Sequence, residues 1–302
     1  MIERIIGTRT SQLALWQTRH IIALLGQVRP DVFCRPESFV TQGDKTLDKP
    51  LPQIGGKGLF TLELEQALLD GRIHFAVHSL KDLPVEDSPG LTLGAIVGRA
   101  DVRDVLVTQD GRSLAELPQN AIVGTSSLRR QSQLRRLRPD LDVRSIRGNV
   151  ETRIRKVHEG QYDATILAAA GVTRLGLDEH IAEWLPLDKM LPAPGQGALA
   201  VQCRADDAET LGLLATIHQP EVAVAVTAER TFLNALGGGC ATPVAAHVVE
   251  VDGRLQFTGY VGSVDGSVTI RVTGSGSDAK TLGQAMAHEA IAKGAQEILT
   301  YA

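Results

Sequence analysis

The sequence has few cysteines and few aromatic residues. Its 302 residues include three cysteines, and Phe, Trp and Tyr together make up 4%. No cysteine belongs to a C-x-x-C pair and their number is odd, which argues against a disulfide framework and favours a reducing compartment. With so few aromatic residues, the core must rest on Leu, Ile, Val and Ala.

Long apolar runs and a strong excess of one charge are missing as well. No run of about 18 apolar residues occurs, so we expect no membrane span. The N-terminal stretch lacks a basic segment followed by an apolar run, so we expect no signal peptide. The formal net charge is −4, which does not suit a polyanion binder. We therefore expect a cytoplasmic protein.

Short apolar runs alternate with helical patterns along the first two thirds of the chain. The runs predict strands at 4–8, 32–40, 73–79, 91–98, 105–108, 121–125, 142–146, 164–169 and 197–204. Helical patterns begin at about Ser11 and span 58–71, and others lie between the later strands. This alternation predicts two α/β domains with parallel sheets and helices on both faces.

The pattern changes toward the C-terminus. A helix is predicted at 222–236, and from about 243 three strands follow, joined by Asp-Gly turns. A last helix is predicted at 278–299. These elements predict a third, smaller α+β domain.

Basic residues gather in one stretch, 124–156, which holds ten basic and three acidic residues in an acidic chain. A solvated helix face accounts for Arg135, Arg136, Arg138 and Arg155. Nucleic-acid binding is a rival interpretation and predicts steep salt dependence. However, the arginines lack interleaved aromatic residues for stacking, so we expect no nucleic-acid partner.

The beginning of this stretch predicts an anion site. The motif "AIVGTSSLRR" leads from a strand through a turn into a helix, whose first N–H groups can bind an anion. Thr125, Ser126 and Ser127 add hydroxyls to the turn. Arg129 and Arg130 oppose the helix dipole, so we expect an anionic ligand to compensate their charge.

The motif "SIRGNVETR" repeats this layout. Arg147 stands at a strand end and Arg153 lies in the next helix. The planar guanidinium of arginine suits carboxylates and phosphates. The repeated layout therefore enlarges the predicted anion site.

A further candidate is the strand end in "AVHSLKDLP". Ser79, Lys81 and Asp82 follow a buried strand, and ligands of open α/β sheets bind outside the carboxyl ends of strands. An ordinary Lys-Asp turn is an equally good interpretation. His74 and His78 suggest a metal pair only on a helix; on a strand they lie ~13 Å apart, so we predict no metal site.

The stretch "TQGDKTLDKPLPQIGGKGLF", 41–60, combines Gly, Pro, Lys and Asp without apolar periodicity. Long irregular loops of this kind are often mobile lids. Lys57, between glycines, is placed to reach an anion. A solvated connector is the alternative interpretation.

Three glycines precede Cys240 in "ALGGGCATPV", between a helix and a strand. Glycine lets the backbone approach a bulky group, and a cysteine on such a loop is expected to be exposed and reactive. Cys203, within an apolar strand, is typical of a buried structural cysteine. No Cys-His-Asn arrangement is evident near Cys240, so we interpret it as a tether for something large and flat.

Together these motifs resemble the porphobilinogen deaminase (hydroxymethylbilane synthase) family. The resemblance covers nearly the whole chain in order, through "TRTSQLALWQ", "VTQGD", "GGKGLF", "VHSLKDLP", "GTSSLRRQSQL", "RSIRGNVETR", "AAAGVTRLGL", "APGQGALAVQCR" and "LGGGCATP".

The resemblance implies a covalent cofactor and a set of anion-binding residues. In this family the cysteine of the glycine loop, here Cys240, carries a dipyrromethane through a thioether bond. The substrate porphobilinogen bears an acetate and a propionate, which explains a need for arginine. The implied cofactor and substrate binders, with the two candidates from the strand end and the lid, are Arg9, Ser11, Lys57, Ser79, Lys81, Thr125, Ser127, Arg129, Arg130, Arg147, Arg153 and Arg174.

The resemblance also implies the reaction. Four porphobilinogen molecules are joined head to tail on the cofactor, with loss of ammonia, into the linear tetrapyrrole hydroxymethylbilane. Asp82 matches the family's catalytic aspartate. Loss of ammonia leaves an azafulvenium ion, whose positive charge a carboxylate beside the pyrrole N–H groups stabilises. The same carboxylate is suited to moving the protons of the reaction.

The family fold has two lobes resembling periplasmic binding proteins around a cleft, and a smaller α+β domain with the cofactor cysteine. Here the first, discontinuous domain would span 1–98 and 197–216, the second 102–192, and the third 220–302. The resemblance also implies a monomer.

The lid departs from the family at Gln42 and Gln53, where basic residues are common. Both changes make the lid less basic, so the resemblance does not decide whether this loop contacts the carboxylates of the ligand. In addition, "TSQLAL" stands where Ser-Pro is usual, a change expected to affect only helix entry.

A non-catalytic, two-lobed module that binds a carboxylate ligand is the second hypothesis. The α/β pattern alone does not separate it from the enzyme. Asp82 and Cys240 discriminate between the two, since a pure binder needs neither residue.

Overall fold

The computed structural model describes residues 2–45, 58–86, 88–239 and 241–300, and the chain divides into two units. Unit 1 comprises Met1–Leu47, Gly55–Ala100 and Gly197–Ala223. Unit 2 comprises Asp48–Ile54, Asp101–Gln196 and Val224–Ala302. The division into three domains stays a prediction.

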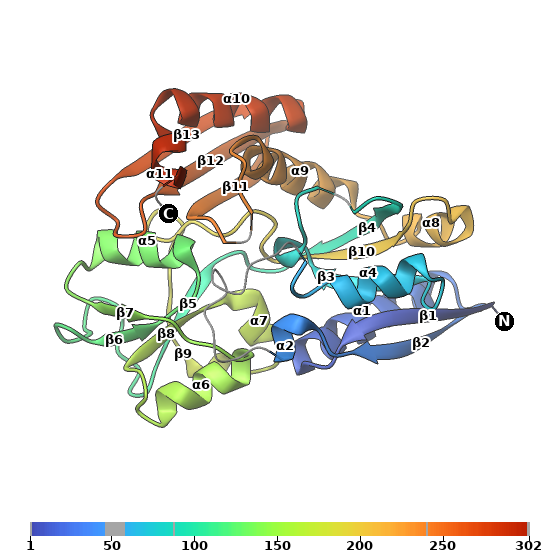
Figure 1. The fold of residues 1–302 in the computed structure, drawn as a ribbon, viewed down its shortest axis with the longest axis horizontal. Coiled ribbons are helices and arrows are strands. Elements are labelled where there is room, and N and C mark those ends of the chain that lie inside the picture. The colour runs from blue at the N-terminus through green and yellow to red at the C-terminus, as the bar shows by residue number, and fades with distance from the viewer. Residues whose placement is uncertain (1, 46–57, 87, 240, 301–302) are drawn as a thin grey trace. The chain divides into compact units, whose positions relative to one another are not determined.

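A five-stranded sheet with the order β2-β1-β3-β10-β4 forms unit 1 (Figure 1). Its strands are β1 (Ile2–Arg9), β2 (Val32–Phe39), β3 (Phe75–Ser79), β4 (Leu91–Arg99) and β10 (Ala198–Arg204). Its helices are α1 (Gln12–Val28), α2 (Gln42–Lys45), α4 (Leu62–Leu69) and α8 (Ala208–Ala215), with the 3-10 turn η1 (Leu80–Asp82). Ile21 and Leu25 of α1 pack with Phe75 and Val201 of the sheet in one buried cluster.

The sheet of unit 1 is mixed, which corrects the prediction of a parallel sheet. β1 pairs in parallel with β2 and β3, whereas β10 runs antiparallel to both of its neighbours, β3 and β4. A βαβ crossover imposes parallel pairing. β10 returns to this sheet after the long segment 101–196, so no such crossover fixes its direction.

Unit 2 contains a second five-stranded sheet, with the order β7-β6-β8-β5-β9. Its strands are β5 (Asp104–Thr108), β6 (Ile122–Gly124), β7 (Asp142–Arg144), β8 (Ala164–Ala168) and β9 (Ile181–Trp184). The accompanying helices are α5 (Leu128–Leu137), α6 (Val150–His158) and α7 (Ala169–Arg174), with the 3-10 turn η2 (Asp178–His180). β5 is antiparallel to β8 and β9, so this sheet is mixed too.

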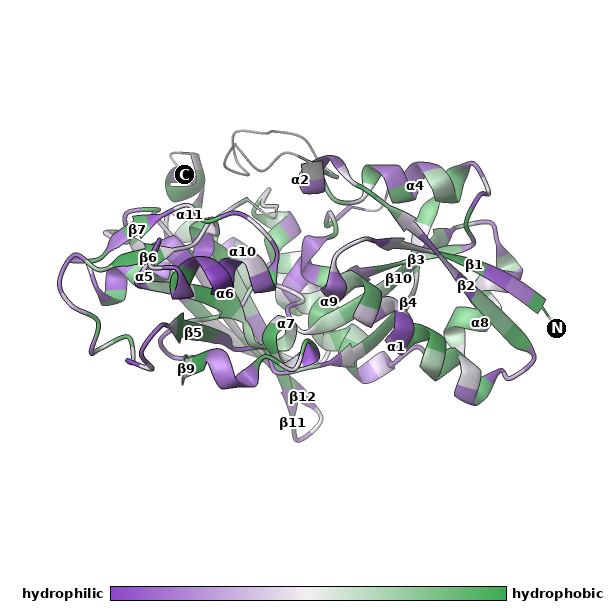
Figure 2. Ribbon diagram, turned by 90° about the horizontal axis from the view of Figure 1, so that it is seen from below, coloured by the Kyte–Doolittle hydropathy of each residue, from purple (hydrophilic) through white to green (hydrophobic). Residues whose placement is uncertain are grey.

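Figure 2 shows α5 as largely hydrophilic, in keeping with its sequence LRRQSQLRRL, whereas the strand β5 of the same unit is mainly hydrophobic. One side of α5 is nevertheless buried, because Leu134 packs into the core cluster that contains Leu106 of β5 and Ile166 of β8. The helix therefore sits on the sheet through few apolar residues.

The C-terminal part of unit 2 is an antiparallel sheet of β11 (Val244–Val251), β12 (Arg254–Gly262) and β13 (Thr269–Gly276), as predicted. Its helices are α9 (Pro220–Ala235, whose first residues belong to unit 1), α10 (Ala279–Ala292) and α11 (Ala295–Thr300). Asp252 and Gly253, with φ of 51° and 73°, form the predicted Asp-Gly turn. The predicted last helix is two helices, because Gly294 with φ 97° interrupts it.

Within the part of the chain that the structure describes, no single helix is long and apolar enough to cross a membrane. The bent pair α8 and α9 meets the length and composition requirements when the two helices are taken together. Several apolar residues of this pair, including Leu213, Leu214 and Phe232, are buried within the protein.

Candidate active site

The end of β3 presents the first predicted group of site residues. β3 is buried from Phe75 to His78, and the chain then enters the turn η1. Leu80 and Leu83 are buried on either side of this turn, and the Leu83 N–H donates to the Leu80 carbonyl at 3.2 Å. Between these anchors, Asp82 is exposed. The turn therefore holds the Asp82 carboxylate at the strand end, where solvent and small molecules reach it.

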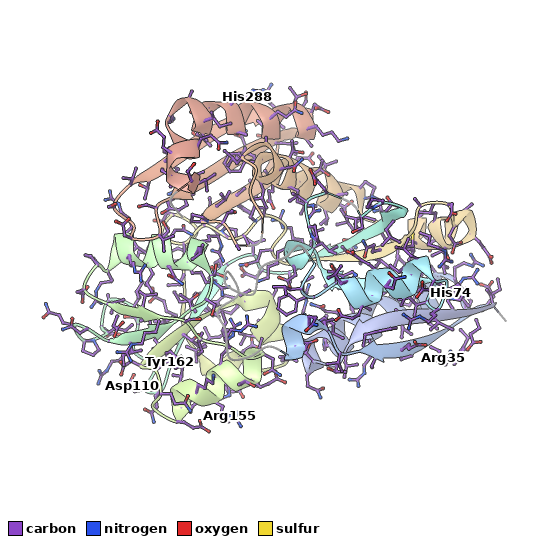
Figure 3. The ribbon with its side chains drawn as sticks, in the orientation of Figure 1. Arg35, His74, Asp110, Arg155, Tyr162 and His288 are labelled. Atoms are coloured by element: carbon purple, nitrogen blue, oxygen red, sulfur yellow. The ribbon has the colours of Figure 1, made fainter. Side chains whose placement is uncertain are left out.

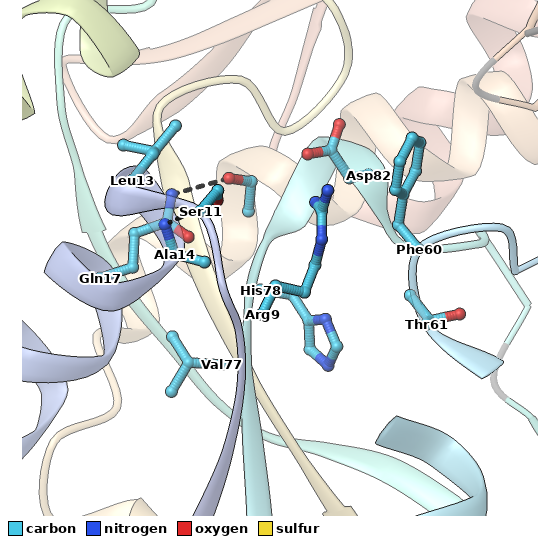
Figure 4. A pocket seen from close by; sticks show the side chains of 11 residues that line it. Arg9, Ser11, Leu13, Ala14, Gln17, Phe60, Thr61, Val77, His78 and Asp82 are labelled. Carbon is cyan, nitrogen blue, oxygen red and sulfur yellow. Dashed lines mark hydrogen bonds between the residues drawn. The ribbon is translucent and has the colours of Figure 1, made fainter. Parts of the chain in front are cut away.

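Asp82 lines a pocket of unit 1 together with three other predicted site residues, Arg9, Ser11 and Ser79. Figure 4 shows the Asp82 carboxylate and the Arg9 guanidinium at the same end of this pocket, with the Phe60 ring beside them. The remaining lining residues are Leu13, Ala14, Gln17, Thr61, Val77 and His78.

Two hydrogen bonds fix the polar wall of this pocket. Ser11 caps helix α1, where its Oγ accepts from the Ala14 N–H at 3.3 Å. Gln17 is buried, and its Nε2 donates to the Ser79 Oγ at 2.8 Å (Figure 4). The sequence analysis missed Gln17, although its amide is the polar group in an otherwise core-facing position of the helix.

Arg9 is engaged within the protein. Its Nε donates to the Asp44 Oδ2 at 3.2 Å, a second nitrogen pairs with Asp44 Oδ1, and its guanidinium lies 4.4 Å from the centre of the Phe60 ring. Burial raises the pKa of Asp44, but the hydrogen bond and charge of Arg9 outweigh it and hold that pKa below its ordinary value. Arg9 is thus paired with the Asp44 carboxylate of the same chain, a partner that the sequence did not reveal.

His78 lies beneath this group on β3. Its ring is buried, and burial together with the nearby charge of Arg9 lowers its pKa to about 4. The imidazole is therefore neutral at physiological pH. Within the described residues, no group of three His, Cys, Asp or Glu side chains is arranged to hold a metal ion.

The second predicted group begins at the turn before α5. Ser127 is the N-cap, with its Oγ accepting from the Arg130 N–H at 3.5 Å, and Thr125 Oγ1 accepts from the Ser127 N–H at 3.3 Å. Ser126 reaches across to the next loop, where its Oγ donates to the Ile146 carbonyl at 2.7 Å. The hydroxyls thus stabilise the turn through hydrogen bonds within the protein.

Arg129 and Arg130 are buried, and they share one internal carboxylate. Arg129 Nη1 and Arg130 Nη2 each lie 2.7 Å from an oxygen of Asp104, whose side chain has no exposed surface. The predicted anionic ligand stays a prediction, and the structure adds an internal carboxylate that the sequence did not reveal. Asp104 supplies part of the compensation, because folding brings the first residue of β5 under α5.

The remaining predicted arginines lie on α6, before it, and on α7. Arg147 and Arg174 are partly buried, and burial lowers the pKa of both, to about 10 for Arg174. Arg153 Nε donates to the Gly148 carbonyl at 2.9 Å. Asn149 caps α6 by accepting from the Thr152 N–H at 2.9 Å, and this cap fixes the start of the helix that carries Arg153.

The arginines assigned to a solvated helix face divide into two kinds. Arg155 and Arg136 are exposed, and Figure 3 shows Arg155 pointing outward from α6. Arg138 is instead partly buried and bonds to the carbonyls of Leu114 and Leu117, and Arg135 Nη1 donates to the Val264 carbonyl at 2.9 Å. Both arginines therefore link α5 to other segments of unit 2. The sequence pattern could not distinguish such arginines from those of a solvated helix face.

Three predicted features, Lys57, Gln53 and Cys240, lie outside the described residues. The glycines before Cys240 are described up to Gly239. Gly238 is buried, and a side chain there would come within 2.6 Å of Leu233, whereas Gly239 has open space around it.

These observations define the class of protein first. The chain is an α/β protein with two mixed five-stranded sheets. Unit 1 presents a carboxylate at a strand end, and unit 2 holds two buried arginines where a strand turns into a helix. Guanidinium groups suit ligands that carry carboxylates.

Comparison with known proteins identifies the family. The family model described as porphobilinogen deaminase, dipyrromethane cofactor binding domain, matches residues 5–212, and the one described as its C-terminal domain matches residues 223–292. The porphobilinogen deaminase of Syntrophotalea carbinolica is 51% identical over 296 residues, covering 97% of this chain and 94% of that protein. That of Brevibacillus brevis is 48% identical over 295 residues, covering 97% and 96%.

The chain belongs to the porphobilinogen deaminase family. Its activity is that of a hydroxymethylbilane synthase, a transferase that assembles a tetrapyrrole on a dipyrromethane cofactor. The alternative of a non-catalytic binding module is set aside. Among solved structures, the periplasmic aliphatic sulphonate binding protein SsuA from Escherichia coli is 12% identical, with a TM-score of 0.43, covering 76% of this chain and 68% of that one.

Proposed function

We propose that Asp82 is the catalytic carboxylate of this transferase and that Cys240 carries the dipyrromethane. We also propose that the cofactor and porphobilinogen are bound by Arg9, Ser11, Lys57, Ser79, Lys81, Thr125, Ser127, Arg129, Arg130, Arg147, Arg153 and Arg174. The observation that carries the proposal is the exposed Asp82 carboxylate at the end of β3, in a pocket with an arginine.

The position of Asp82 suits the chemistry of the reaction. Each condensation begins when ammonia leaves porphobilinogen, and positive charge spreads over a pyrrole ring whose N–H group becomes more acidic. A fixed carboxylate that accepts this N–H stabilises the charge as it develops. Asp82 also accepts, at a carboxylate oxygen, the proton that the pyrrole carbon loses on rearomatisation, and it gives this proton to the amine of the next porphobilinogen, which then leaves as ammonia.

The buried arginines of unit 2 fit a ligand with carboxylate groups. Arg129 and Arg130 have exposed fractions of 3% and 6%, and in the described part of the chain the Nε of each lacks a hydrogen-bond partner. A buried N–H donor without an acceptor is costly. An acetate or propionate oxygen is the acceptor that both atoms fit, so the residues present suit the cofactor and its substrate.

The glycines that precede Cys240 in the sequence leave room for a bulky attachment. Gly239 has no heavy atom within 4 Å of where a side chain would begin, and it is exposed. The preceding Gly237 adopts φ 69° and ends helix α9, so the chain turns sharply before the cysteine. When bound, the dipyrromethane supplies the pyrrole carbon nucleophile that starts the chain.

Intact mass under denaturing conditions tests the attachment. We expect the purified protein, as isolated or after incubation with porphobilinogen, to carry an excess equal to two linked pyrrole units. Cys240→Ala should lack this excess, because no thiol remains to form the thioether. Cys34→Ala is the matched control and should retain it, since Cys34 lies on β2. An excess that persists in Cys240→Ala would contradict the proposed attachment.

Turnover tests the role of Asp82. We expect Asp82→Asn to keep the fold and to lower the rate of hydroxymethylbilane formation by at least about 100-fold, the usual effect of removing a group that stabilises developing charge. Asp70→Asn is the control, because Asp70 is an exposed carboxylate at the end of α4. Normal turnover of a loaded Asp82→Asn protein would remove Asp82 from the mechanism.

We further propose that the protein acts as a monomer in the cytoplasm on porphobilinogen, without a nucleic-acid or membrane partner. Cys34 and Cys203, the cysteines among the described residues, are free, which supports a reducing compartment. Sedimentation of the loaded protein with the mass of one chain would agree with this proposal, and a dimer at working concentration would contradict it.

A further inference from the structure

A buried charge cluster in unit 2 lies beneath the predicted anion site, and no role in the reaction has yet been given to its acidic member. The cluster consists of Asp104, Arg129, Arg130 and Gln196. Asp104 has no exposed surface, and the two arginine side chains are 4% and 7% exposed. Gln196 is fully buried as well.

The hydrogen bonds of Asp104 hold both guanidinium groups from one side. Its Oδ2 accepts from Arg129 Nη1 and its Oδ1 from Arg130 Nη2, both at 2.7 Å. Its Oδ1 also accepts from Gln196 Nε2 at 2.9 Å. One carboxylate therefore joins two arginines that are neighbours in sequence and would otherwise repel each other.

Backbone carbonyls complete the inner side of the cluster. Arg129 Nη1 donates to the Leu191 carbonyl at 2.7 Å, and Arg130 Nη1 donates to the Ile166 carbonyl at 3.0 Å. Within the described residues, both Nε atoms have no acceptor. The protein thus binds Arg129 Nη1 and both terminal nitrogens of Arg130, and it leaves the two Nε donors for a further acceptor.

The backbone of Asp104 is rigidly placed. It is the first residue of β5, a strand paired on one side with β8 and on the other with β9, and the Leu185 N–H donates to its carbonyl at 3.0 Å. A group on a central strand keeps its position more closely than one on a loop. The Asp104 carboxylate therefore has a fixed position, and its hydrogen bonds orient Arg129 and Arg130 of α5.

The charges of the cluster do not cancel. Burial raises the pKa of Asp104, but the charges and hydrogen bonds of Arg129 and Arg130 outweigh it and hold that pKa well below its ordinary value, so the carboxyl is ionised. Two guanidinium groups and one carboxylate leave one net positive charge in a buried place. One further carboxylate would bring the cluster to neutrality.

From this geometry we propose that Asp104 is a positioning residue for the known reaction: it locks Arg129 and Arg130 so that they bind a carboxylate of the cofactor or of the growing chain. The inference rests on the proposed anion-binding role of the two arginines. Without Asp104, two adjacent like charges separate, and their donors no longer converge. Gln196 supports the same carboxylate as a third donor.

The test uses the full-length loaded protein and the variants Asp104→Asn, Arg129→Gln and Arg130→Gln, together with the double variant of Asp104 and Arg130. The fraction of chains with cofactor is read from intact mass, and KM and kcat for porphobilinogen are measured on loaded protein. We expect Asp104→Asn to lower loading or to raise KM at least about tenfold, with kcat changed about threefold at most. In the Arg130→Gln background, the same substitution should have less than half of this effect, because residues of one network are not additive.

Asp140→Asn is the matched control. Asp140 also pairs with an arginine, Arg138, at 2.7 Å, but its side chain is 29% exposed. We expect its loading, KM and kcat to equal those of the parent. This comparison separates the loss of any Asp-Arg pair from the loss of the pair that orients the site.

Several results would overturn the inference. Unchanged loading and KM in Asp104→Asn, a lowered KM, or full additivity with Arg130→Gln would each show that Asp104 does not act through the arginines. If Asp104→Asn does not fold, Gln196→Leu decides. This variant loses the hydrogen bond from Nε2 to Asp104, along with one to the Val102 carbonyl at 2.7 Å. It should raise KM at least about threefold, and an unchanged KM would overturn the inference. If Arg129→Gln and Arg130→Gln are themselves without effect, the proposed function of the arginines fails instead.

Discussion

At the scale of the residue, His78 makes the stability of the protein depend on pH. Its pKa of about 4 in the folded state lies below the ordinary value of 6.5, because the ring is buried and Arg9 is near. Above pH 6.5 the imidazole is neutral in both the folded and the unfolded chain. As the pH falls, the unfolded chain takes up a proton that the folded one does not, so stability is lost between pH 6.5 and about 4.

We expect the free energy of unfolding to fall by at most about 3 kcal/mol from this group over that range. Substitution His78→Asn should flatten the pH dependence, even if it lowers stability at neutral pH. Urea unfolding at pH 7.5 and pH 5 measures the difference. His288→Asn is the control, because His288 is exposed on α10 (Figure 3). An equal pH dependence in His78→Asn and the parent would contradict the assignment.

The site residues could be proposed from the sequence, but the hydrogen-bond partners that the structure gives them could not be predicted. Arg129 and Arg130 stand out because they oppose a helix dipole, and the resemblance to a family gives them a role. Asp104 gave one weak signal, an acidic residue directly before the apolar run "VLVT". Only folding brings β5 under α5, so no local pattern relates Asp104 to residues more than twenty positions away.

At the scale of the element, the loop between β12 and β13 packs closely against α5. Gly266 has φ 75°, and a side chain there would come within 2.7 Å of the Arg136 N and 2.8 Å of the Ser132 carbonyl oxygen. Tyr260 of β12 adds a hydrogen bond of 2.7 Å to the Ser132 hydroxyl. The hairpin of the C-terminal sheet therefore supports the helix that carries the buried arginines.

We expect Gly266→Ala to destabilise the protein by about 2 kcal/mol or more, because backbone strain and a clash with backbone atoms act together. Gly253→Ala is a matched control: its φ is 73°, but it has nothing within 4 Å, so only the strain of about 1 kcal/mol remains. Urea unfolding of both variants measures the two effects. Equal destabilisation would show that the contact with α5 contributes nothing.

Elements with a strong local pattern were predictable, and elements defined by distant pairing were not. The Asp252-Gly253 turn follows from the residues that it needs. In contrast, β9 was missed, because its four residues, Ile181–Trp184, are too short to show a period. The direction of β10 was also wrong, since its neighbours in the sheet lie far away in sequence.

At the scale of the whole molecule, the charges explain why an arginine-rich protein remains acidic overall. Several arginines of the basic stretch are matched by acids nearby, among them Arg138 by Asp140 and Arg144 by Asp142. Asp104 forms ion pairs with two further arginines, Arg129 and Arg130. The pairing thus neutralises part of the positive charge of this stretch inside the protein itself.

The antiparallel return of β10 has a consequence for synthesis on the ribosome. The sheet of unit 1 lacks its fourth strand until Ala198–Arg204 has been made, and β3 and β4 have no partner between them before then. The five-stranded sheet of unit 2 draws all its strands from Asp104–Trp184, so it is complete earlier. Pairings between distant segments form late. The N-terminal part of the chain is thus made first, and its sheet closes only after the sheet that follows it.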